Sequence, residues 1–245
     1  MDKPRLHPRA AVRLCGIVVL LLLCLPLHGI WRLFRIKSPW PRIFLGGSGW
    51  CCGTRVHVSG KRCAGPVLFI ANHLSWIDIL LVAGATNSAF VAKADMADWP
   101  VLGWLASLNN SVYVSREARL TVQDQMMLVR DAIGDRQPLT LFPEGTTADG
   151  ISLLPFRSSL LAAVTPPPAG VQVQPLAIDY ASAAPDIAWT DDESVGHNAF
   201  RVLARRGTLP VTLHFLPPLS GETVRNRKHM AAEAQAAIAQ TLGLA

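Results

Sequence analysis

Short apolar runs that alternate with helical patterns constrain the fold of this chain more than any other feature of its sequence. Seven runs have the length and composition of β-strands, and helical periodicity falls between several of them. Such alternation predicts an α/β fold with a mostly parallel sheet flanked by helices. The predicted strands cover residues 55–58, 67–71, 89–92, 112–114, 139–142, 171–178 and 211–216, and the predicted helices cover 77–83, 101–108, 119–133, 157–164 and 222–242.

An apolar run at residues 14–30 precedes this alternation and predicts an N-terminal membrane-associated helical segment. Its 17 residues would reach about 25 Å as a helix, near the short end of what crosses a hydrocarbon core of about 30 Å. Basic residues lie on both sides, so a single span and a helix that dips in and returns to the cytoplasmic face both remain open. A cleaved signal peptide is a third possibility, although Trp31 and Arg32 follow the run instead of small residues.

Positive charge is concentrated in the same part of the chain. Residues 1–62 contain eleven Lys and Arg against the single acid Asp2, whereas residues 63–245 contain twelve against sixteen acids. Cations interleaved with Trp31, Phe34 and Trp40 are typical of a helix at an anionic membrane surface. No zinc-finger or RNA-binding signature is present. We therefore expect membrane lipids as partners and no nucleic acid.

The segment NHLSWID at residues 72–78 directly follows the predicted buried strand at 67–71. Ligands collect beyond the carboxyl ends of such strands, so the location favours chemistry. On one continuous helix His73 and Asp78 would point about 140° apart, so His73 must precede the helix if the two are to meet. Asp78 then either orients His73 as a general base or completes a capping box with Ser75 as the N-cap. The spacing leaves both interpretations open.

A second polar segment, PEGTT at residues 143–147, follows the predicted strand at 139–142 in the same way. Gly145 allows the backbone to approach a ligand closely, and Thr146 offers a hydroxyl donor. The turn is therefore a candidate for holding a polar headgroup or a developing oxyanion. The alternative is an ordinary turn in which Glu144 is solvated.

No pattern in the sequence predicts a metal or nucleotide site. The five cysteines lack C-x2-C spacing, residues 46–50 lack the final glycine of a G-x-S-x-G elbow, and neither a Walker loop nor a G-x-G-x-x-G fingerprint occurs. We therefore expect no metal, no bound cofactor and no serine-hydrolase chemistry. The odd number of crowded cysteines predicts reduced thiols in a cytoplasmic setting.

Together the two segments resemble motifs of the lysophospholipid acyltransferase family. The motif N-H-x4-D is matched by Asn72, His73 and Asp78, and the motif F-P-E-G-T is matched by residues 142–146. Between them, residues 111–116 are similar to the second motif, a strand closed by an arginine, and residues 174–178 are similar to the proline-containing fourth motif. The resemblance extends over about residues 60–220.

The resemblance implies direct transfer of a fatty acyl group to the free hydroxyl of a lysolipid, with acyl-CoA or acyl carrier protein as co-substrate. His73 would remove the hydroxyl proton, and Asp78 would orient the imidazole and stabilise its charged form. It also implies a membrane-associated segment at residues 1–50 and a catalytic domain at 51–245 on the cytoplasmic face of the inner membrane. The residues expected to bind the acceptor are Arg116, Glu144, Gly145, Thr146 and Arg157.

The acceptor that the family implies first is 1-acylglycerol-3-phosphate, which would give phosphatidic acid. However, the third motif commonly continues with arginine, and this chain has Thr147 there. Arg157 is either a replacement cation for a phosphate or a surface residue that opens a helix. Lyso-ornithine lipid, a phosphorus-free acceptor of family members that tolerate threonine at this position, is the alternative. A non-catalytic lipid-binding protein of the same fold is a further one.

Overall fold

The computed structural model of the chain describes residues 7–93, 107–114, 127, 132, 137–190 and 192–244. The predicted helices at 101–108 and 119–133 lie almost wholly outside the described residues, and so does Arg116.

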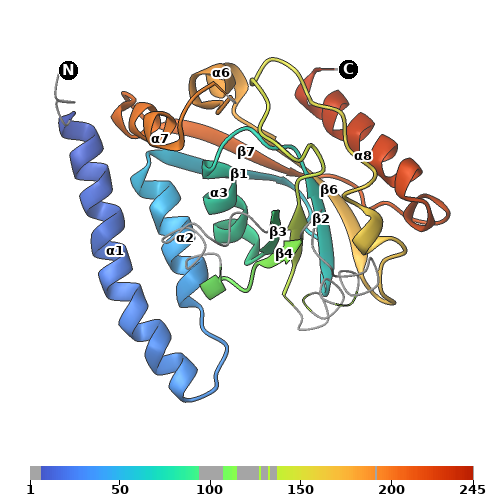
Figure 1. The fold of residues 1–245 in the computed structure, drawn as a ribbon, viewed down its shortest axis with the longest axis horizontal. Coiled ribbons are helices and arrows are strands. Elements are labelled where there is room, and N and C mark those ends of the chain that lie inside the picture. The colour runs from blue at the N-terminus through green and yellow to red at the C-terminus, as the bar shows by residue number, and fades with distance from the viewer. Residues whose placement is uncertain are drawn as a thin grey trace.

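One seven-stranded sheet forms the centre of the molecule (Figure 1). Its strands are β1 Thr54–Gly60, β2 Val67–Ala71, β3 Ala89–Lys93, β4 Val112–Val114, β5 Leu139–Leu141, β6 Gln172–Asp179 and β7 Leu209–Phe215. They lie in the order β1-β7-β6-β2-β5-β3-β4, and neighbours are parallel except β6 and β7. All seven predicted strands are present, and the prediction of a mostly parallel α/β fold is confirmed.

The α-helices of the described residues are α1 Pro8–Leu33, α2 Trp40–Cys51, α3 Ile77–Thr86, α6 Ala184–Ile187, α7 Val195–Ala204 and α8 Arg227–Leu242. Short 3₁₀ helices lie at η2 Ala162–Val164, η3 Ala181–Ala183 and η4 Thr223–Arg225. The helix predicted at 77–83 is confirmed. The helix predicted at 222–242 begins later, because the Asn226 side chain accepts hydrogen bonds from the backbone of Lys228 and His229 and caps α8 there.

The helix predicted at 157–164 is wrong, and the segment consists of turns followed by η2. The backbone N–H of Arg157 is already bonded to the carbonyl of Pro143, which ties this segment to the turn after β5. Three prolines at 166–168 follow within a few residues and lack the N–H groups that would extend a helix. The sequence analysis also missed α2, α6 and α7.

The central strand β2 is buried on both faces and separates two apolar cores. Val67 and Phe69 belong to a cluster formed with α2 and α3, whereas Leu68 and Ile70 belong to a cluster that includes Met230 of α8. Because side chains alternate along a strand, a strand covered on both faces needs an uninterrupted apolar run. Residues 67–71 have such a run, and it is this that fixes β2 in the middle of the fold.

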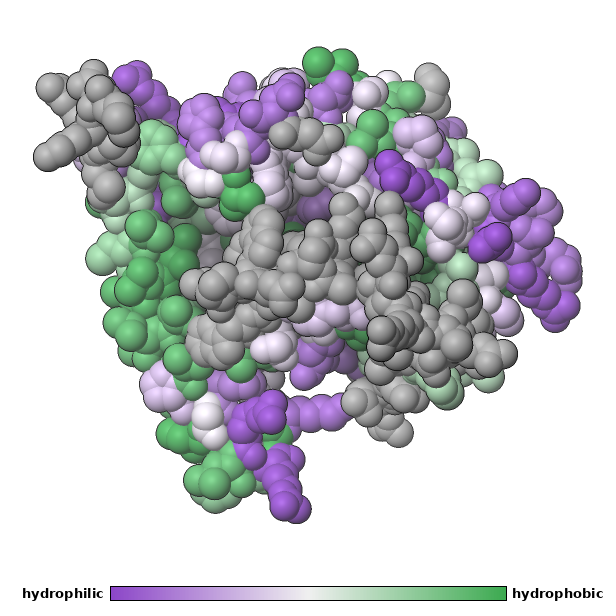
Figure 2. Space-filling model, viewed as in Figure 1, coloured by the Kyte–Doolittle hydropathy of each residue, from purple (hydrophilic) through white to green (hydrophobic). Residues whose placement is uncertain are grey.

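The helices α1 and α2 form an antiparallel hairpin at one side of the molecule (Figure 1). By length and composition, α1 is the one helix of the described chain that is able to cross a membrane. Its 26 residues extend the predicted run at both ends and reach about 39 Å. Many apolar side chains along it are exposed, and Figure 2 shows hydrophobic atoms covering this side of the molecule.

Three neighbouring strands bring polar segments to one edge of the sheet. β2 lies between β5 and β6 and is parallel to both, so their carboxyl ends meet at the same edge. Residues 72–78 follow β2, residues 142–147 follow β5, and Tyr180 follows β6. The candidate site is built from these three chain segments.

Candidate active site

His73 and Asp78 form a hydrogen-bonded pair at this edge. His73 lies in the loop between β2 and α3, and Asp78 lies in the first turn of α3. The distance between His73 Nδ1 and Asp78 Oδ2 is 2.8 Å. The His73 side chain remains 17% exposed, while that of Asp78 is fully buried. The prediction that His73 precedes the helix is confirmed, and its Nε2 is the nitrogen available to a substrate.

Asp78 also binds the backbone that leads into α3. Its Oδ2 accepts hydrogen bonds from the N–H groups of Leu74 at 2.6 Å and Ser75 at 2.9 Å. The buried Ser75 hydroxyl has no hydrogen-bond partner within the described part of the chain, and the N-cap position belongs to Trp76. The predicted capping by Ser75 is therefore wrong. Asp78 contacts both the backbone and His73, so the two interpretations of this carboxylate do not exclude one another.

An aromatic stack fixes the plane of the His73 ring. The ring centroids of His73 and Phe142 lie 4.1 Å apart, with 13° between the planes. The Phe142 ring also stacks with the ring of Phe90 in β3: their centroids lie 5.9 Å apart, with 11° between the planes. With Nδ1 held by Asp78 and the ring packed against Phe142, the direction of Nε2 is set before a substrate binds.

Glu144 is buried beneath the loop that carries His73 instead of facing solvent. Its Oε1 accepts a hydrogen bond from the His73 N–H at 2.8 Å, and its Oε2 accepts one from the Leu154 N–H at 3.3 Å. Burial raises the pKa of Glu144 to about 8, and these backbone hydrogen bonds oppose the shift. The interpretation of a solvated Glu144 is wrong. A direct contact with the acceptor stays a prediction, whereas the support of His73 is observed.

The remaining predicted binding residues lie around the same turn, except Arg116, which is outside the described residues. Gly145 adopts φ +73°, a left-handed conformation that glycine adopts at little cost. Thr146 follows it and is partly buried. The Arg157 N–H donates to the Pro143 carbonyl at 2.9 Å, and its side chain is exposed. Their contacts with an acceptor stay predictions.

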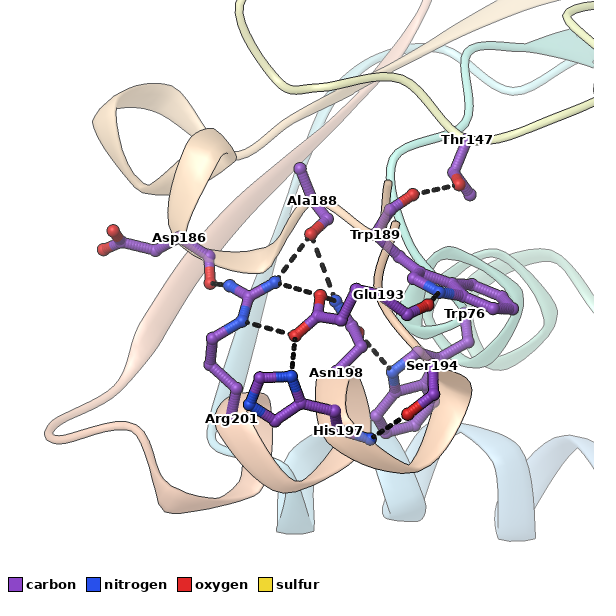
Figure 3. Close-up of polar contacts among 10 residues, drawn as sticks. All are labelled: Trp76, Thr147, Asp186, Ala188, Trp189, Glu193, Ser194, His197, Asn198 and Arg201. Atoms are coloured by element: carbon purple, nitrogen blue, oxygen red, sulfur yellow. Dashed lines mark hydrogen bonds and ion pairs between the residues drawn. The ribbon is translucent and has the colours of Figure 1, made fainter. Parts of the chain in front are cut away.

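Thr147 joins this turn to the segment that contains α6 and α7. Its hydroxyl donates a hydrogen bond to the carbonyl of Trp189 (Figure 3). The N–H of Trp189 in turn donates to the Leu74 carbonyl at 2.9 Å. Trp189 therefore connects the loop after β2 with the loop after β5.

A polar network at the beginning of α7 contacts Trp76, which follows the loop that carries His73 (Figure 3). Trp76 Nε1 donates to Asn198 Oδ1 at 3.0 Å, and Asn198 Nδ2 donates to Glu193 Oε2 at 2.7 Å. Arg201 donates to both Glu193 oxygens, at 3.0 and 2.6 Å. Hydrogen bonds from Arg201 lower the pKa of Glu193 to about 2, so its carboxylate stays charged at neutral pH. The network holds Trp76 against α7.

Asn72, the first residue of the motif, continues the pairing of β2 with β6. Its Nδ2 donates to the Ile178 carbonyl at 3.0 Å, and the Ile178 N–H donates to its Oδ1 at 2.8 Å. On the opposite side, the N–H of Ala148 donates to the His73 carbonyl at 2.8 Å. The loop that carries His73 is thus fixed by β6 and by the loop after β5.

The sequence analysis did not identify Tyr180, Trp189 or Asn198 as parts of this site. Tyr180 Oη donates a hydrogen bond to Asp78 Oδ1 at 2.5 Å, across a separation of 102 residues. No local spacing connects residues so far apart in the chain. The one available signal was that Tyr180 closely follows the strand predicted at 171–178, just as the two motif segments follow predicted strands.

The geometry of the pair suits proton transfer. When Nδ1–H faces the Asp78 carboxylate, Nε2 is unprotonated and can accept a proton from a hydroxyl. Asp78 then stabilises the imidazolium that forms. Within the described residues, no group of three His, Cys, Asp or Glu side chains is placed to hold a metal ion.

The chain matches known proteins over most of its length. A family model described as Acyltransferase matches residues 54–179, which include the loops after β2 and β5. The lyso-ornithine lipid O-acyltransferase of Rhizobium meliloti (strain 1021) is 34% identical over 238 residues, which cover 89% of this chain and 81% of that protein. The 1-acyl-sn-glycerol-3-phosphate acyltransferase of Neisseria gonorrhoeae is 33% identical over 114 residues, 46% of this chain and 44% of that protein.

One solved structure has the same fold over nearly the whole chain. The 1-acyl-sn-glycerophosphate (LPA) acyltransferase PlsC of Thermotoga maritima matches with a TM-score of 0.65 and covers 97% of each chain. The sequence identity is 16%, so this likeness concerns the fold.

Proposed function

Since this chain belongs to the acyltransferase family and is a lysolipid O-acyltransferase, we propose that its acceptor is the free hydroxyl of lyso-ornithine lipid. The Rhizobium meliloti relative, which matches 89% of this chain, carries that activity in its name. The motifs alone implied 1-acylglycerol-3-phosphate first, and the relative named for that acceptor matches 46% of the chain.

The contact of Thr147 is the observation that carries this choice. The family's third motif commonly has an arginine at this position, where a cation would suit a phosphate. Thr147 instead donates its hydroxyl to the Trp189 carbonyl and supplies no positive charge. An acceptor whose headgroup is an amino acid does not require a phosphate-binding cation there.

The proposed reaction is a direct acyl transfer with His73 as general base. His73 Nε2 takes the proton of the acceptor hydroxyl while the hydroxyl oxygen attacks the thioester carbonyl of acyl-CoA or acyl carrier protein. The tetrahedral intermediate collapses, the carbon–sulfur bond breaks, and the leaving thiolate takes the proton back from the imidazolium. Asp78 stabilises the imidazolium throughout. General-base catalysis of this kind by a positioned side chain contributes about 10² to 10⁴ in rate.

We infer that the α1–α2 hairpin attaches the protein to the cytoplasmic face of the inner membrane without crossing it. The Arg13 guanidinium donates to the carbonyls of Val202, Leu203 and Gly207, which fixes the beginning of α1 to the domain. In Figure 1, α1 runs alongside α2 and begins near α7, so its first turns lie against the domain. A full span would carry the domain into the hydrocarbon layer, whereas the exposed apolar side of α1 fits a helix embedded in one face.

The second candidate acceptor is 1-acylglycerol-3-phosphate, and the position of Arg157 favours it. This exposed side chain follows the turn at 142–147, to which its backbone is bonded. A guanidinium there is available for a phosphate.

An acceptor comparison tests the proposal. The purified full-length protein is given radiolabelled acyl-CoA or acyl carrier protein and either lyso-ornithine lipid or 1-acylglycerol-3-phosphate, with His73→Ala as the blank. We expect product from lyso-ornithine lipid, with a kcat/KM at least about tenfold above that for the phosphate acceptor. Acylation of the phosphate acceptor alone would overturn the assignment, and no transfer to either would favour a lipid-binding protein.

Substitution of Thr147 provides a matched test of specificity. Thr147→Arg restores the cation, and we expect the ratio of kcat/KM for the phosphate acceptor over lyso-ornithine lipid to rise about tenfold. Thr147→Val removes the hydroxyl without adding charge, and it should lower both values alike. An unchanged ratio in Thr147→Arg would show that position 147 does not select the acceptor.

A further inference from the structure

Tyr180 is a buried tyrosine that the proposed reaction has not used so far. It directly follows β6, whose pairing with β2 brings it to the candidate active site. Its side chain is 1% exposed, and its hydroxyl donates to Asp78 Oδ1 at 2.5 Å. Burial raises the pKa of Tyr180 well above its ordinary value, so the phenol stays protonated and remains a donor at any working pH.

The two oxygens of Asp78 have different partners. Oδ2 is hydrogen-bonded to His73 Nδ1 and accepts hydrogen bonds from the N–H groups of Leu74 and Ser75. Oδ1 accepts a hydrogen bond from the Tyr180 hydroxyl, which is its one donor within the described part of the chain. Removing that hydroxyl would leave a buried carboxylate oxygen without a partner and would alter both the orientation of the carboxylate and its negative charge.

We propose that Tyr180 is a positioning residue of the acyl transfer: its hydroxyl holds Asp78 so that Oδ2 faces His73, and it withdraws part of the charge that Asp78 presents to the imidazole. This proposal rests on the proposed roles of His73 and Asp78. Tyr180 has no path to the substrate, because its side chain is enclosed in the core cluster that contains Phe69 and Ile178. It acts only through Asp78.

The pH profile separates this role from core packing. A general base must be unprotonated to accept a proton, so the acidic limb of kcat/KM reports on the base that the reaction uses. Without the hydrogen bond from the Tyr180 hydroxyl, the Asp78 carboxylate presents more negative charge to His73. This charge favours the imidazolium more strongly. In Tyr180→Phe we therefore expect the acidic limb to move up by about half a pH unit or more and the plateau rate to fall roughly tenfold.

Other titratable groups near Tyr180 do not produce this limb. Glu144 has a pKa raised to about 8 by burial and titrates on the basic side. Cys52, whose charge would also affect Tyr180, has a pKa raised to about 12 by burial and stays neutral. Neither Glu144 nor Cys52 therefore accounts for an acidic limb.

Val211→Ala is the control for a loss of stability. Val211 is a buried residue of β7 in the same core cluster, and its neighbour in the register is Val56 of β1. A destabilised but folded Val211→Ala protein should keep the wild-type limb. If Tyr180→Phe also keeps it, Tyr180 is only a packing residue and the proposal fails.

Two further measurements keep the test decisive if Tyr180→Phe folds poorly. The chain has two tyrosines, and replacing both with 3-fluorotyrosine preserves the shape but makes the hydroxyl a stronger donor. The acidic limb should then move to lower pH, opposite to the effect of phenylalanine; a limb that does not move contradicts the proposal. In addition, Tyr180→Phe should lower kcat less in an Asp78→Asn background than in the wild type, whereas full additivity would show that Tyr180 acts independently of Asp78.

These assays use whichever acceptor the wild-type protein acylates. An incorrect acceptor assignment would therefore leave the test of Tyr180 intact. A wild-type protein without transferase activity would contradict the proposed function. An active protein in which changes at Tyr180 do not move the acidic limb of kcat/KM would contradict only the positioning role.

Discussion

At the scale of single residues, the site depends on how many contacts converge on one loop. The backbone groups of His73 and Leu74 are bonded to Glu144, Ala148, Trp189 and Asp78. These partners come from the loop after β5, from the segment after α6 and from α3, the helix that follows. A loop fixed on every side keeps the imidazole in one orientation, which general-base catalysis requires.

The first residue-level prediction separates catalysis from capping. We expect His73→Ala to lose about 10² to 10⁴ in kcat while remaining folded. Asp78→Asn should lower both activity and stability, because a neutral amide cannot support an imidazolium and presents N–H groups to buried donors. The measurements are acyl-transfer rate and thermal unfolding.

Ser75→Ala is the matched control for this pair of variants. The Ser75 hydroxyl is buried without a partner in the described residues, so its removal should leave both rate and stability close to wild type. Substantial turnover by His73→Ala would remove the base assignment. A stability loss in Ser75→Ala equal to that of Asp78→Asn, with normal activity in both, would reduce Asp78 to a cap.

The second residue-level prediction follows from the protonation of Glu144. Its pKa is raised from 4.5 to about 8 by burial, so the unfolded state releases this proton at lower pH than the folded state. The contribution of Glu144 to the free energy of unfolding is fully present below pH 4.5, and it is lost as pH rises through about 8. In this window the free energy of unfolding should fall by up to about 1.4 kcal/mol per pH unit, and Glu144→Gln should remove that slope.

Glu193→Gln provides a control with the opposite sign. The pKa of Glu193 is lowered to about 2 by Arg201, so its contribution is present above its ordinary pKa and is lost in acid. Denaturant unfolding between pH 5 and 8, a range chosen as roughly the linkage window of Glu144, should therefore show an unchanged slope in Glu193→Gln. If Glu144→Gln also kept the wild-type pH dependence of the free energy of unfolding, the buried, protonated state of Glu144 would be contradicted.

At the scale of elements, two glycines allow α2 to pack closely on α3. A Cβ added to Gly84 of α3 would lie 2.5 Å from the Cα of Gly46 in α2. Since both atoms belong to backbone, the two helices would have to move apart. α3 also carries Asp78, so this helix crossing links the membrane-facing hairpin to the site.

We therefore expect Gly84→Ala to destabilise the protein by about 1 to 3 kcal/mol, as overpacking does, and to reduce activity by displacing Asp78. Gly196→Ala in α7 is the matched control, because a Cβ there meets nothing within 4 Å. That change should be neutral or slightly stabilising, since alanine favours helix over glycine. Thermal unfolding of both variants tests the crossing, and equal midpoints would show that α2 and α3 adjust without cost.

At the scale of the whole molecule, the hairpin gives the protein one apolar side. Leu22 and Leu23 of α1 are 66% and 58% exposed, and Figure 2 shows hydrophobic residues along the side of the molecule where α1 lies. The double variant Leu22→Glu/Leu23→Glu should bind anionic phospholipid vesicles at least about tenfold more weakly, because each leucine contributes roughly 1.5 to 3 kcal/mol when removed from water. Vesicle flotation with the full-length protein measures this.

Ile151→Glu is the control for the vesicle experiment. Ile151 is 69% exposed but lies in the loop after β5, away from the hairpin. Binding should be unaffected by this variant. Equal losses in both proteins would show that vesicle binding follows general surface hydrophobicity and not the hairpin.

The elements that could be predicted from sequence are those whose patterns arise from burial. β2 is apolar at every position because both of its faces are covered, whereas β7 alternates between buried and more exposed positions. Both patterns can be recognised locally, and all seven strands were found. α2 was missed because Gly46, Gly47 and Gly49 lower its helix propensity, and only packing against α1 and α3 explains them. α6 was missed because its four residues are too few to show a helical period. α7 was missed although Ser194 offered an N-cap signal at its beginning.

The sequence by itself determined the fold class, the seven strands, and the identity of His73, Asp78 and the turn at 142–147, because burial periodicity and short motifs are encoded locally. Only the tertiary structure decided that Asp78 serves the helix and the imidazole together, that Glu144 is buried, and that Thr147 turns toward Trp189. It also decided that Tyr180 meets Asp78. These outcomes depend on which strands become neighbours in the sheet, and strand order is set by the packing of the whole chain and not by any local run of residues.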